Sequence, residues 1–143
     1  MTQIETAFLY ALTLYGTSAD ADQEQHAKIN DFLIDAGFPQ EDIDNPPWCA
    51  AFLNAVLHRS GLPVTNSLAA ESFLQWGEPT TIPMLGDVVV FQWTKNIGGG
   101  HHVGFVCAVY PTIVYVLGGN EDGMVEIKGY DPKYVMQYRR LEK

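Results

Sequence analysis

The spacing of hydrophobic residues changes once along this chain of 143 residues, near Gly77. Before that point hydrophobic residues recur every three to four positions, the period of an α-helix with one buried face. After it, short runs rich in valine, isoleucine and aromatic residues alternate with turn residues, as in β-strands. Helices followed by strands predict an α+β fold, because α/β folds alternate the two. We therefore expect N-terminal helices packed on a C-terminal antiparallel sheet of about five strands.

Individual elements can be placed from the same pattern. Helices are expected over residues 4–15, 20–37 and 45–61, and a short one over 67–76 that the sequence Gly77-Glu78-Pro79 ends. Strands are expected over 87–93, 103–110, 113–117, 124–128 and 135–141. The links between strands are short and contain Gly, Pro or Asp, which favours an antiparallel meander.

Length and composition limit the class of protein. A chain of this length, 47% hydrophobic, is expected to form a single domain, residues 1–143, with a substantial core. It contains no apolar run of the roughly 18–20 residues that a membrane span needs. The first residues lack the basic side chains that open a signal peptide. We therefore expect no membrane insertion and synthesis in the cytoplasm without a signal peptide.

The balance of charge and the cysteine content exclude further classes. The formal net charge is −9, with 8 Lys and Arg against 17 Asp and Glu, which argues against nucleic acid as a partner because phosphate binding needs clustered basic residues. The only two cysteines, Cys49 and Cys107, lie too far apart for a zinc-ligand pattern. No metal and no cofactor is expected, and a disulfide between these cysteines is disfavoured in a cytoplasmic product.

The helix predicted over residues 45–61 carries a cysteine in its first turn. Asn45 can cap the helix, Pro46 suits its first position and Gly61 can end it. Cys49 recurs at helical spacing with Phe52, Leu53, Val56 and Leu57. The N–H groups and the positive dipole end of a helix N-terminus favour a thiolate. We therefore hypothesise that Cys49 is a nucleophile; the alternative is a small buried hydrophobic residue.

A cysteine nucleophile needs a base, and the chain has four histidines. His58 is about half a turn out of phase with Cys49 on the same helix and should face away. His26 lies among polar neighbours. His101 and His102 are adjacent in a predicted strand and point to opposite faces, so only one of them can meet Cys49.

Strand alternation favours one of these two histidines only slightly. His102 shares its face with Gly104, Val106 and Ala108, and two small residues there would leave room for a packed helix. His101 shares its face with Val103, Phe105 and Cys107. A metal site is disfavoured, because two adjacent strand histidines cannot chelate one ion comfortably.

A third group should orient the base from the neighbouring strand. That strand runs into Gly118-Gly119-Asn120-Glu121-Asp122-Gly123. Asn120 can accept an imidazole N–H through its amide oxygen, and Glu121 can do so as a carboxylate. The alternative interpretation of this segment is an ordinary hairpin turn.

Four short motifs in a fixed order resemble a known family. They are Trp-Cys-Ala-Ala-Phe (48–52), Gly-Asp-Val-Val-Val-Phe (86–91), His-Val-Gly-Phe (102–105) and Leu-Gly-Gly-Asn (117–120). The chain thus resembles the CHAP and NlpC group of papain-like cell-wall hydrolases, especially small phage-associated members. The resemblance implies a papain-like fold in which a helix N-terminus carries the nucleophile, Cys49, against a sheet that carries the base, His102. It places Asn120 as the residue that orients the histidine, with Glu121 as the alternate.

The resemblance also implies a function. The expected substrate is bacterial peptidoglycan, cut at an amide bond of the stem peptide or cross-bridge by an N-acetylmuramoyl-L-alanine amidase or an endopeptidase. Trp48, Trp93 and His101 are candidates for substrate binding, although aromatic residues at such spacings are more often core. The second histidine and the glycine-rich segment 96–100 before it depart from the family pattern.

Other functions remain open on the sequence. The chain could be a secreted antibacterial amidase toxin with an immunity protein, a hydrolase or acyltransferase of the same fold with another amide substrate, or a phage structural or binding module that has lost the chemistry. The acidic charge fits poorly with unaided approach to a negatively charged envelope. It favours action on the wall after release or after delivery by a partner.

Overall fold

The structure, a computed structural model, describes residues 1–19, 22–39, 48–92, 100–121 and 123–141. Three α-helices precede the sheet: α1 (Gln3–Thr13), α2 (Gln23–Asp35) and α3 (Cys49–Arg59). There are two 3₁₀-helices in the described residues: η1 (Ala70–Gln75) lies between α3 and the first strand, and η2 (Pro132–Tyr134) lies between the last two strands. The strands are β1 (Glu78–Thr80), β2 (Val88–Gln92), β3 (His101–Val109), β4 (Val114–Glu121), β5 (Met124–Tyr130) and β6 (Val135–Arg140). The predicted α+β class, with helices first and strands afterwards, is confirmed.

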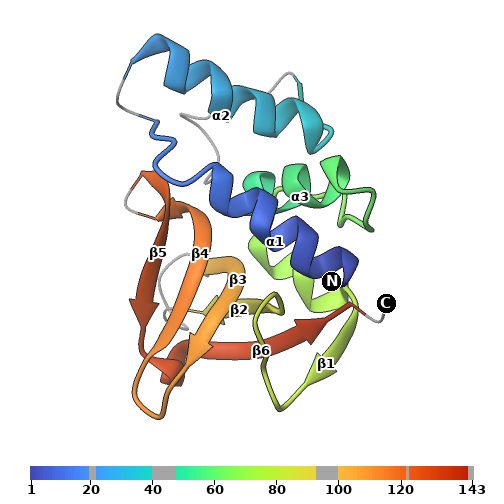
Figure 1. Ribbon diagram of the computed structural model, residues 1–143, viewed down its shortest axis with the longest axis vertical. Helices are drawn as coiled ribbons and strands as arrows, with labels where there is room; N and C mark the ends of the chain where they lie inside the picture. The colour runs from blue at the N-terminus through green and yellow to red at the C-terminus, as the bar shows by residue number, and fades with distance from the viewer. Residues whose placement is uncertain (20–21, 40–47, 93–99, 122, 142–143) are drawn as a thin grey trace.

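The helices stack on one side of the sheet, with α2 outermost and α1 crossing in front of the strands (Figure 1). The first two helices are capped as their sequences favour. Thr2 accepts the Glu5 N–H while the Glu5 carboxylate accepts the Thr2 N–H, a complete capping box for α1. Asp22 caps α2 by accepting the N–H of Gln25.

Helix α3 is the central helix of the molecule. Every residue from Cys49 to Leu57 is buried, which is typical of a helix surrounded by other elements. The buried Asn54 side chain exchanges hydrogen bonds with Thr65 and donates one to the carbonyl of Ser67, so that the segment after α3 is held against it. The helix begins at Cys49 with Trp48 as its N-cap, later than expected, and the predicted capping residues Asn45 and Pro46 lie outside the described residues.

The sheet has six strands in the order β1-β6-β2-β3-β4-β5, and all of its pairs are antiparallel. The expected meander holds from β2 to β5. β6 then returns to pair with β2 on the far side of the meander. The additional strand β1 lies at the sheet edge, where the sequence suggested only a helix stop; Pro79 is tolerated there because an edge strand can lack one donor.

Both faces of the sheet are buried over its central strands. The face toward the helices contributes Val88, Val90, Val103, Phe105, Leu117 and Val125 to the main core. The opposite face carries a second apolar cluster formed by Val89, Phe91, Val106, Val114 and Val116, with Tyr130, Tyr134, Val135 and Tyr138 packed against it. This double burial explains why Val88–Phe91 is hydrophobic at every position rather than at every second one.

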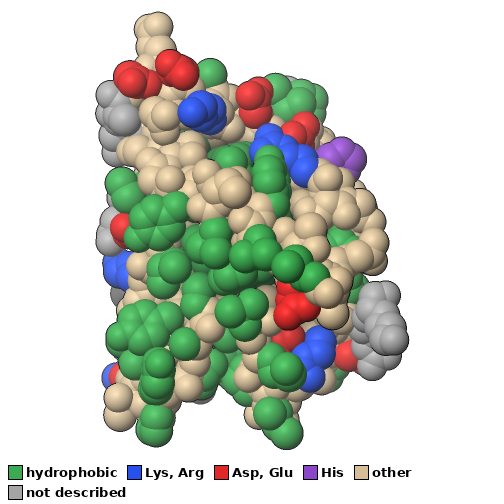
Figure 2. All heavy atoms as spheres, viewed as in Figure 1, with side chains coloured by type: hydrophobic (Ala, Val, Ile, Leu, Met, Phe, Trp, Pro, Cys, Tyr) green, Lys and Arg blue, Asp and Glu red, His purple; other side chains and the backbone are tan. Residues whose placement is uncertain are grey.

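The outer surface also carries apolar side chains. Figure 2 shows hydrophobic side chains grouped across the middle of one face, over α1 and the neighbouring strands. Among the described residues, none of the helices combines the length and the apolar character needed to cross a membrane.

Candidate active site

Cys49 is the first residue of α3 and is only 3% exposed. Within the described part of the chain, no side chain caps this helix, in contrast to α1 and α2. The backbone N–H groups of a helix's first turn have no partners inside the helix and carry its positive dipole end. Cys49 therefore sits where a negative charge, on sulfur or on a bound oxygen, is stabilised.

His102 is the second residue of β3 and is 7% exposed. It lies opposite Phe91 of β2, and the two rings stack with centroids 6.2 Å apart. Its Nε2 is 2.8 Å from Oε2 of Glu121, and the Cys49 side chain is within hydrogen-bond reach of the same ring. Because Nε2 is held by Glu121, Nδ1 is the ring nitrogen that remains for the cysteine.

The surroundings of His102 favour its charged form. Burial by itself would lower the pKa of His102, but hydrogen bonds to Cys49 and to Glu121, together with the negative charge of both partners, raise that pKa from 6.5 to about 10. The ring is therefore an imidazolium at neutral pH. It lies between a cysteine sulfur and a carboxylate, the arrangement of a nucleophile, a proton carrier and an orienting group.

The side chain that pairs with Nε2 of His102 is Glu121 rather than Asn120. Continuing the β3–β4 pairing from Phe105↔Leu117 without interruption would set Asn120 opposite His102. However, between Gly118↔Glu126 and Glu121↔Met124 strand β4 advances three residues while β5 advances two, so β4 contains a bulge. Asn120 adopts a left-handed backbone conformation, φ 58°, within that bulge. The bulge shifts the strand alternation by one residue and brings Glu121 to His102.

Two glycines before the bulge make room for this arrangement. A Cβ on Gly118 would lie 2.6 Å from Oε2 of Glu121. A Cβ on Gly119 would lie 2.5 Å from Cβ of Phe52 and 2.8 Å from Cζ3 of Trp48. Gly118 therefore leaves space for the carboxylate, and Gly119 lets the start of α3 approach β4. The segment 118–121 forms the end of β4 rather than an ordinary turn.

The sequence favoured His102 over His101 because Gly104 and Ala108 on its face would leave room for a packed helix. The structure shows that none of the described α-helices packs on that face. Gly104 lies on the face away from the helices, and a Cβ there would collide with Val116 of the neighbouring strand. The helices instead pack on the face of Val103 and Phe105. His102 meets Cys49 because each residue lies at the beginning of its element, where α3 starts beside the sheet.

The remaining candidate residues lie elsewhere. His101 points to η1, where its Nδ1 is 3.7 Å from Oε2 of the exposed Glu71. Trp48 is 3% exposed and stacks on Phe32, a core position. Trp93 lies outside the described residues.

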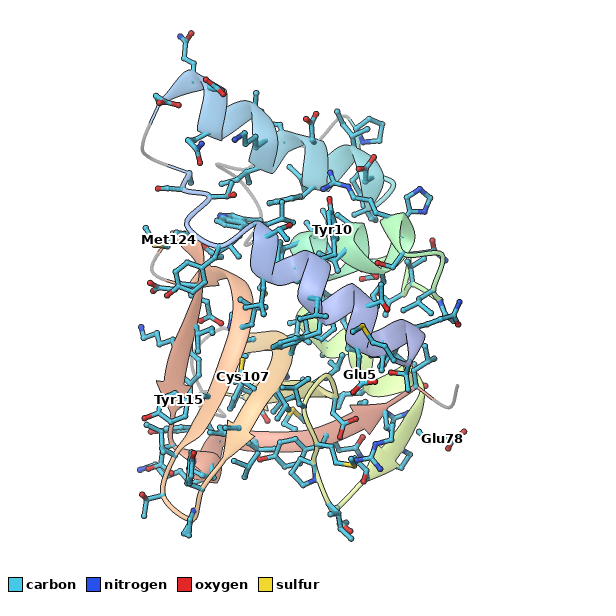
Figure 3. All side chains as sticks on the ribbon, in the orientation of Figure 1. Glu5, Tyr10, Glu78, Cys107, Tyr115 and Met124 are labelled. Carbon is cyan, nitrogen blue, oxygen red and sulfur yellow. The ribbon has the colours of Figure 1, made fainter. Side chains whose placement is uncertain are left out.

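Cys107, the second cysteine, is also free and lies on β3 (Figure 3). It is the extra residue at a bulge between Val106 and Ala108. Burial raises the pKa of its thiol to about 11, despite a hydrogen bond from the Leu117 backbone that acts in the other direction. Cys107 therefore remains a neutral thiol at neutral pH, which distinguishes it from a nucleophile.

Tyr130, the last residue of β5, also contacts the site, although no motif in the sequence pointed to it. Its hydroxyl donates a hydrogen bond to Oε1 of Glu121, and its ring lies 5.6 Å from the ring of His102. Glu121 and Tyr130 lie nine positions apart on two paired strands, with a bulge between them. Local spacing in the sequence does not predict that such residues meet. Tyr130 could have been found only from the tertiary structure.

Within the described ranges, no three His, Cys, Asp or Glu side chains form a group that could hold a metal ion. Glu121 and His102 are instead satisfied by each other.

A comparison with protein families gives a match for the part of the chain that contains Cys49 and His102. The model of the CHAP domain family matches residues 41–120, more than half of the chain. The match includes Cys49 and His102 and ends one residue before Glu121. Comparisons with curated proteins and with solved structures gave no significant match.

Proposed function

Because the chain belongs to the CHAP domain family, whose members are typically hydrolases acting on peptidoglycan, we propose that it cleaves an amide bond of peptidoglycan with Cys49 as the nucleophile. One observation carries this proposal, the hydrogen-bonded series Cys49–His102–Glu121 at the uncapped start of α3. The bond is an amide of the stem peptide or of the cross-bridge.

The reaction begins with attack by the Cys49 thiolate on the amide carbonyl carbon, which forms a C–S bond and moves the carbonyl electrons onto oxygen. The backbone N–H of Cys49 donates to this oxyanion, aided by the dipole of α3. The His102 imidazolium gives its Nδ1 proton to the amide nitrogen, the C–N bond breaks, and the amine leaves a thioester on Cys49.

The second half of the reaction returns the enzyme to its starting state. Neutral His102 takes a proton from water, and the resulting hydroxide attacks the thioester carbonyl. The C–S bond then breaks, so the carboxylic acid product leaves and the thiolate–imidazolium pair is restored. Throughout, Glu121 holds the Nε2–H of His102 and keeps Nδ1 directed at the reacting atoms.

The proposal is tested by wall lysis with matched cysteine variants. Cys49→Ala should lower the rate at which purified peptidoglycan suspensions clear by at least about a thousandfold, because the nucleophile is lost. Cys107→Ala should retain the wild-type rate, since that thiol takes no part. Circular dichroism would verify that both variants are folded, and undiminished lysis by folded Cys49→Ala would refute the mechanism.

The histidines give a second comparison. His102→Ala should match the loss seen with Cys49→Ala, whereas His101→Ala should lose far less, because His101 faces Glu71. The reverse order would assign the base to His101. Mass spectrometry of fragments released from defined peptidoglycans would identify the amide that is cut. A wild-type protein that binds peptidoglycan without releasing fragments would favour a binding module instead.

A further inference from the structure

Tyr130 contacts two members of the candidate active site from β5. Its hydroxyl donates to Oε1 of Glu121. Its ring is tilted against His102 at 5.6 Å and against Phe91 at 5.0 Å, between ring centroids. The phenol therefore has a polar contact to the carboxylate and an apolar contact to the imidazole.

The two oxygens of Glu121 have different partners. Oε2 faces Nε2 of His102 at 2.8 Å, and Oε1 accepts from Tyr130. The Glu121 side chain has no exposed surface, so water cannot replace either partner without rearrangement. A buried carboxylate is costly unless its oxygens are hydrogen-bonded.

Rotation of a carboxylate about its last bond is soft, because the terminal torsion of glutamate has a broad minimum. A single hydrogen bond to His102 would leave Glu121 free to turn, and the imidazole would turn with it. A second hydrogen bond on the other oxygen removes that freedom. The phenol ring of Tyr130, packed against Phe91 and His102, is itself fixed by its neighbours.

We propose that Tyr130 is a positioning residue, which holds the Glu121 carboxylate and through it the His102 ring in the orientation that serves Cys49. This inference rests on the proposed function, because the reaction that Tyr130 would assist is the amide cleavage proposed above. Tyr130 lies beyond the residues that match the family, so nothing in that match assigns it a role.

Few charged or titratable groups of the described residues lie near Glu121, His102 and Tyr130. Cys49 approaches from α3, Glu121 from β4, and Cys107 from β3 interacts electrostatically with Glu121. On β5, Nζ of Lys128 lies 5.8 Å from the centre of the Tyr130 ring. The substitution Tyr130→Phe changes none of these charges and keeps the ring.

The test compares Tyr130→Phe with Tyr138→Phe, since Tyr138 packs in the same apolar cluster. Tyr130→Phe should lower kcat about tenfold with KM unchanged, the effect of losing one hydrogen bond to a charged group.

Alkylation of Cys49 by iodoacetamide at pH 7, followed by peptide mass mapping, should slow in Tyr130→Phe by a similar factor. At pH 9.5 the two proteins should react at rates within about twofold, because an ordinary thiol is then largely ionised. Tyr138→Phe should behave as wild type in each measurement.

A double variant separates positioning from general support of the fold. If Tyr130 acts through Glu121, the variant Glu121→Gln/Tyr130→Phe should be no slower than Glu121→Gln alone. Additive losses, equal losses in Tyr138→Phe, or a change in KM alone would overturn the proposal. The alkylation assay uses no peptidoglycan. A wild-type protein with a reactive Cys49 but no lytic activity would therefore refute the proposed function while leaving the role of Tyr130 testable.

Discussion

At the scale of single residues, the candidate active site depends on one buried ion pair. Glu121 is entirely buried and His102 nearly so, and the two are joined by a hydrogen bond of 2.8 Å. Removing charges from water is expensive unless they are paired, so the loss of either side chain would leave the other buried without this partner. The same pairing fixes which ring nitrogen faces Cys49.

The residue that orients His102 can be identified by two substitutions at adjacent positions. Glu121→Gln should lower kcat by about ten- to a hundredfold, because a hydrogen bond between charged groups is replaced by a neutral one. Asn120→Gly should keep nearly normal activity, since glycine adopts the left-handed φ of 58° without strain. Initial rates of fragment release measure both. Equal or larger loss in Asn120→Gly would return the orienting role to Asn120.

At the scale of elements, the site depends on how closely α3 approaches β4. Gly119 faces the first turn of α3, where a Cβ in place of its hydrogen would collide with Trp48 and Phe52. The nucleophile begins that same turn. A change in the spacing between α3 and β4 would therefore move Cys49 relative to His102.

Adding one methyl group at Gly119 should show this coupling. Gly119→Ala should lower the free energy of unfolding by about 1–3 kcal/mol and should reduce activity, because Cβ of Phe52, which cannot rotate away, lies 2.5 Å from the added carbon. The matched control is Gly129→Ala on β5, where the nearest atom, also at 2.5 Å, is Cδ1 at the flexible end of Ile113. Urea denaturation and lysis assays on both variants measure the difference. Equal destabilisation by the two substitutions would contradict the close approach of α3.

At the scale of the whole molecule, the return of β6 to β2 completes the sheet. Arg139 on β6 is buried and donates to the carbonyls of Trp76 at 2.8 Å and Gly77 at 2.9 Å. These bonds join the end of the chain to the segment between η1 and β1. Strand β6 thus lies between the edge strand β1 and β2, and β2 in turn pairs with β3, which carries His102.

The charge state of the site also affects global stability. The pKa of His102 is raised in the folded protein, so the folded state binds a proton that the unfolded chain releases above about pH 6.5. Stability from this group is fully present below that pH and is lost as the pH rises toward about 10. The slope for one proton is at most about 1.4 kcal/mol per pH unit.

This dependence is best measured in a variant without the Cys49 thiol, so that Glu121 is the remaining one of the two partners that raise the pKa of His102. In Cys49→Ala, with Glu121 still in place, the free energy of unfolding should fall as pH rises from about 6.5 to 8.5. Cys49→Ala/His102→Gln should be nearly flat up to about pH 8. Above that pH Cys107 begins to ionise in the unfolded chain, whereas burial raises its pKa to about 11 in the folded protein. Urea unfolding at several pH values provides the data. A flat curve for Cys49→Ala would show that Glu121 alone does not hold the proton on His102.

The sequence by itself was sufficient for the fold class, the three helices, most strands, and the expectation that Cys49 lies in the first turn of a helix while His102 lies at the start of a strand. These features follow from local rules, because hydrophobic period and turn residues act over a few neighbouring positions. Helix starts were less well predicted, since α3 begins at Cys49 without a side-chain cap.

Only the tertiary structure decided the partners across the sheet. The short edge strand β1 and the pairing of β6 with β2 depend on contacts far apart in the chain. The choice of Glu121 over Asn120 depends on a bulge that regular alternation does not predict, and Tyr130 enters the site through the same rearrangement. A single extra residue in a strand reverses which side chains face the site. The identity of the residue that pairs with His102 was therefore set by strand pairing rather than by local sequence.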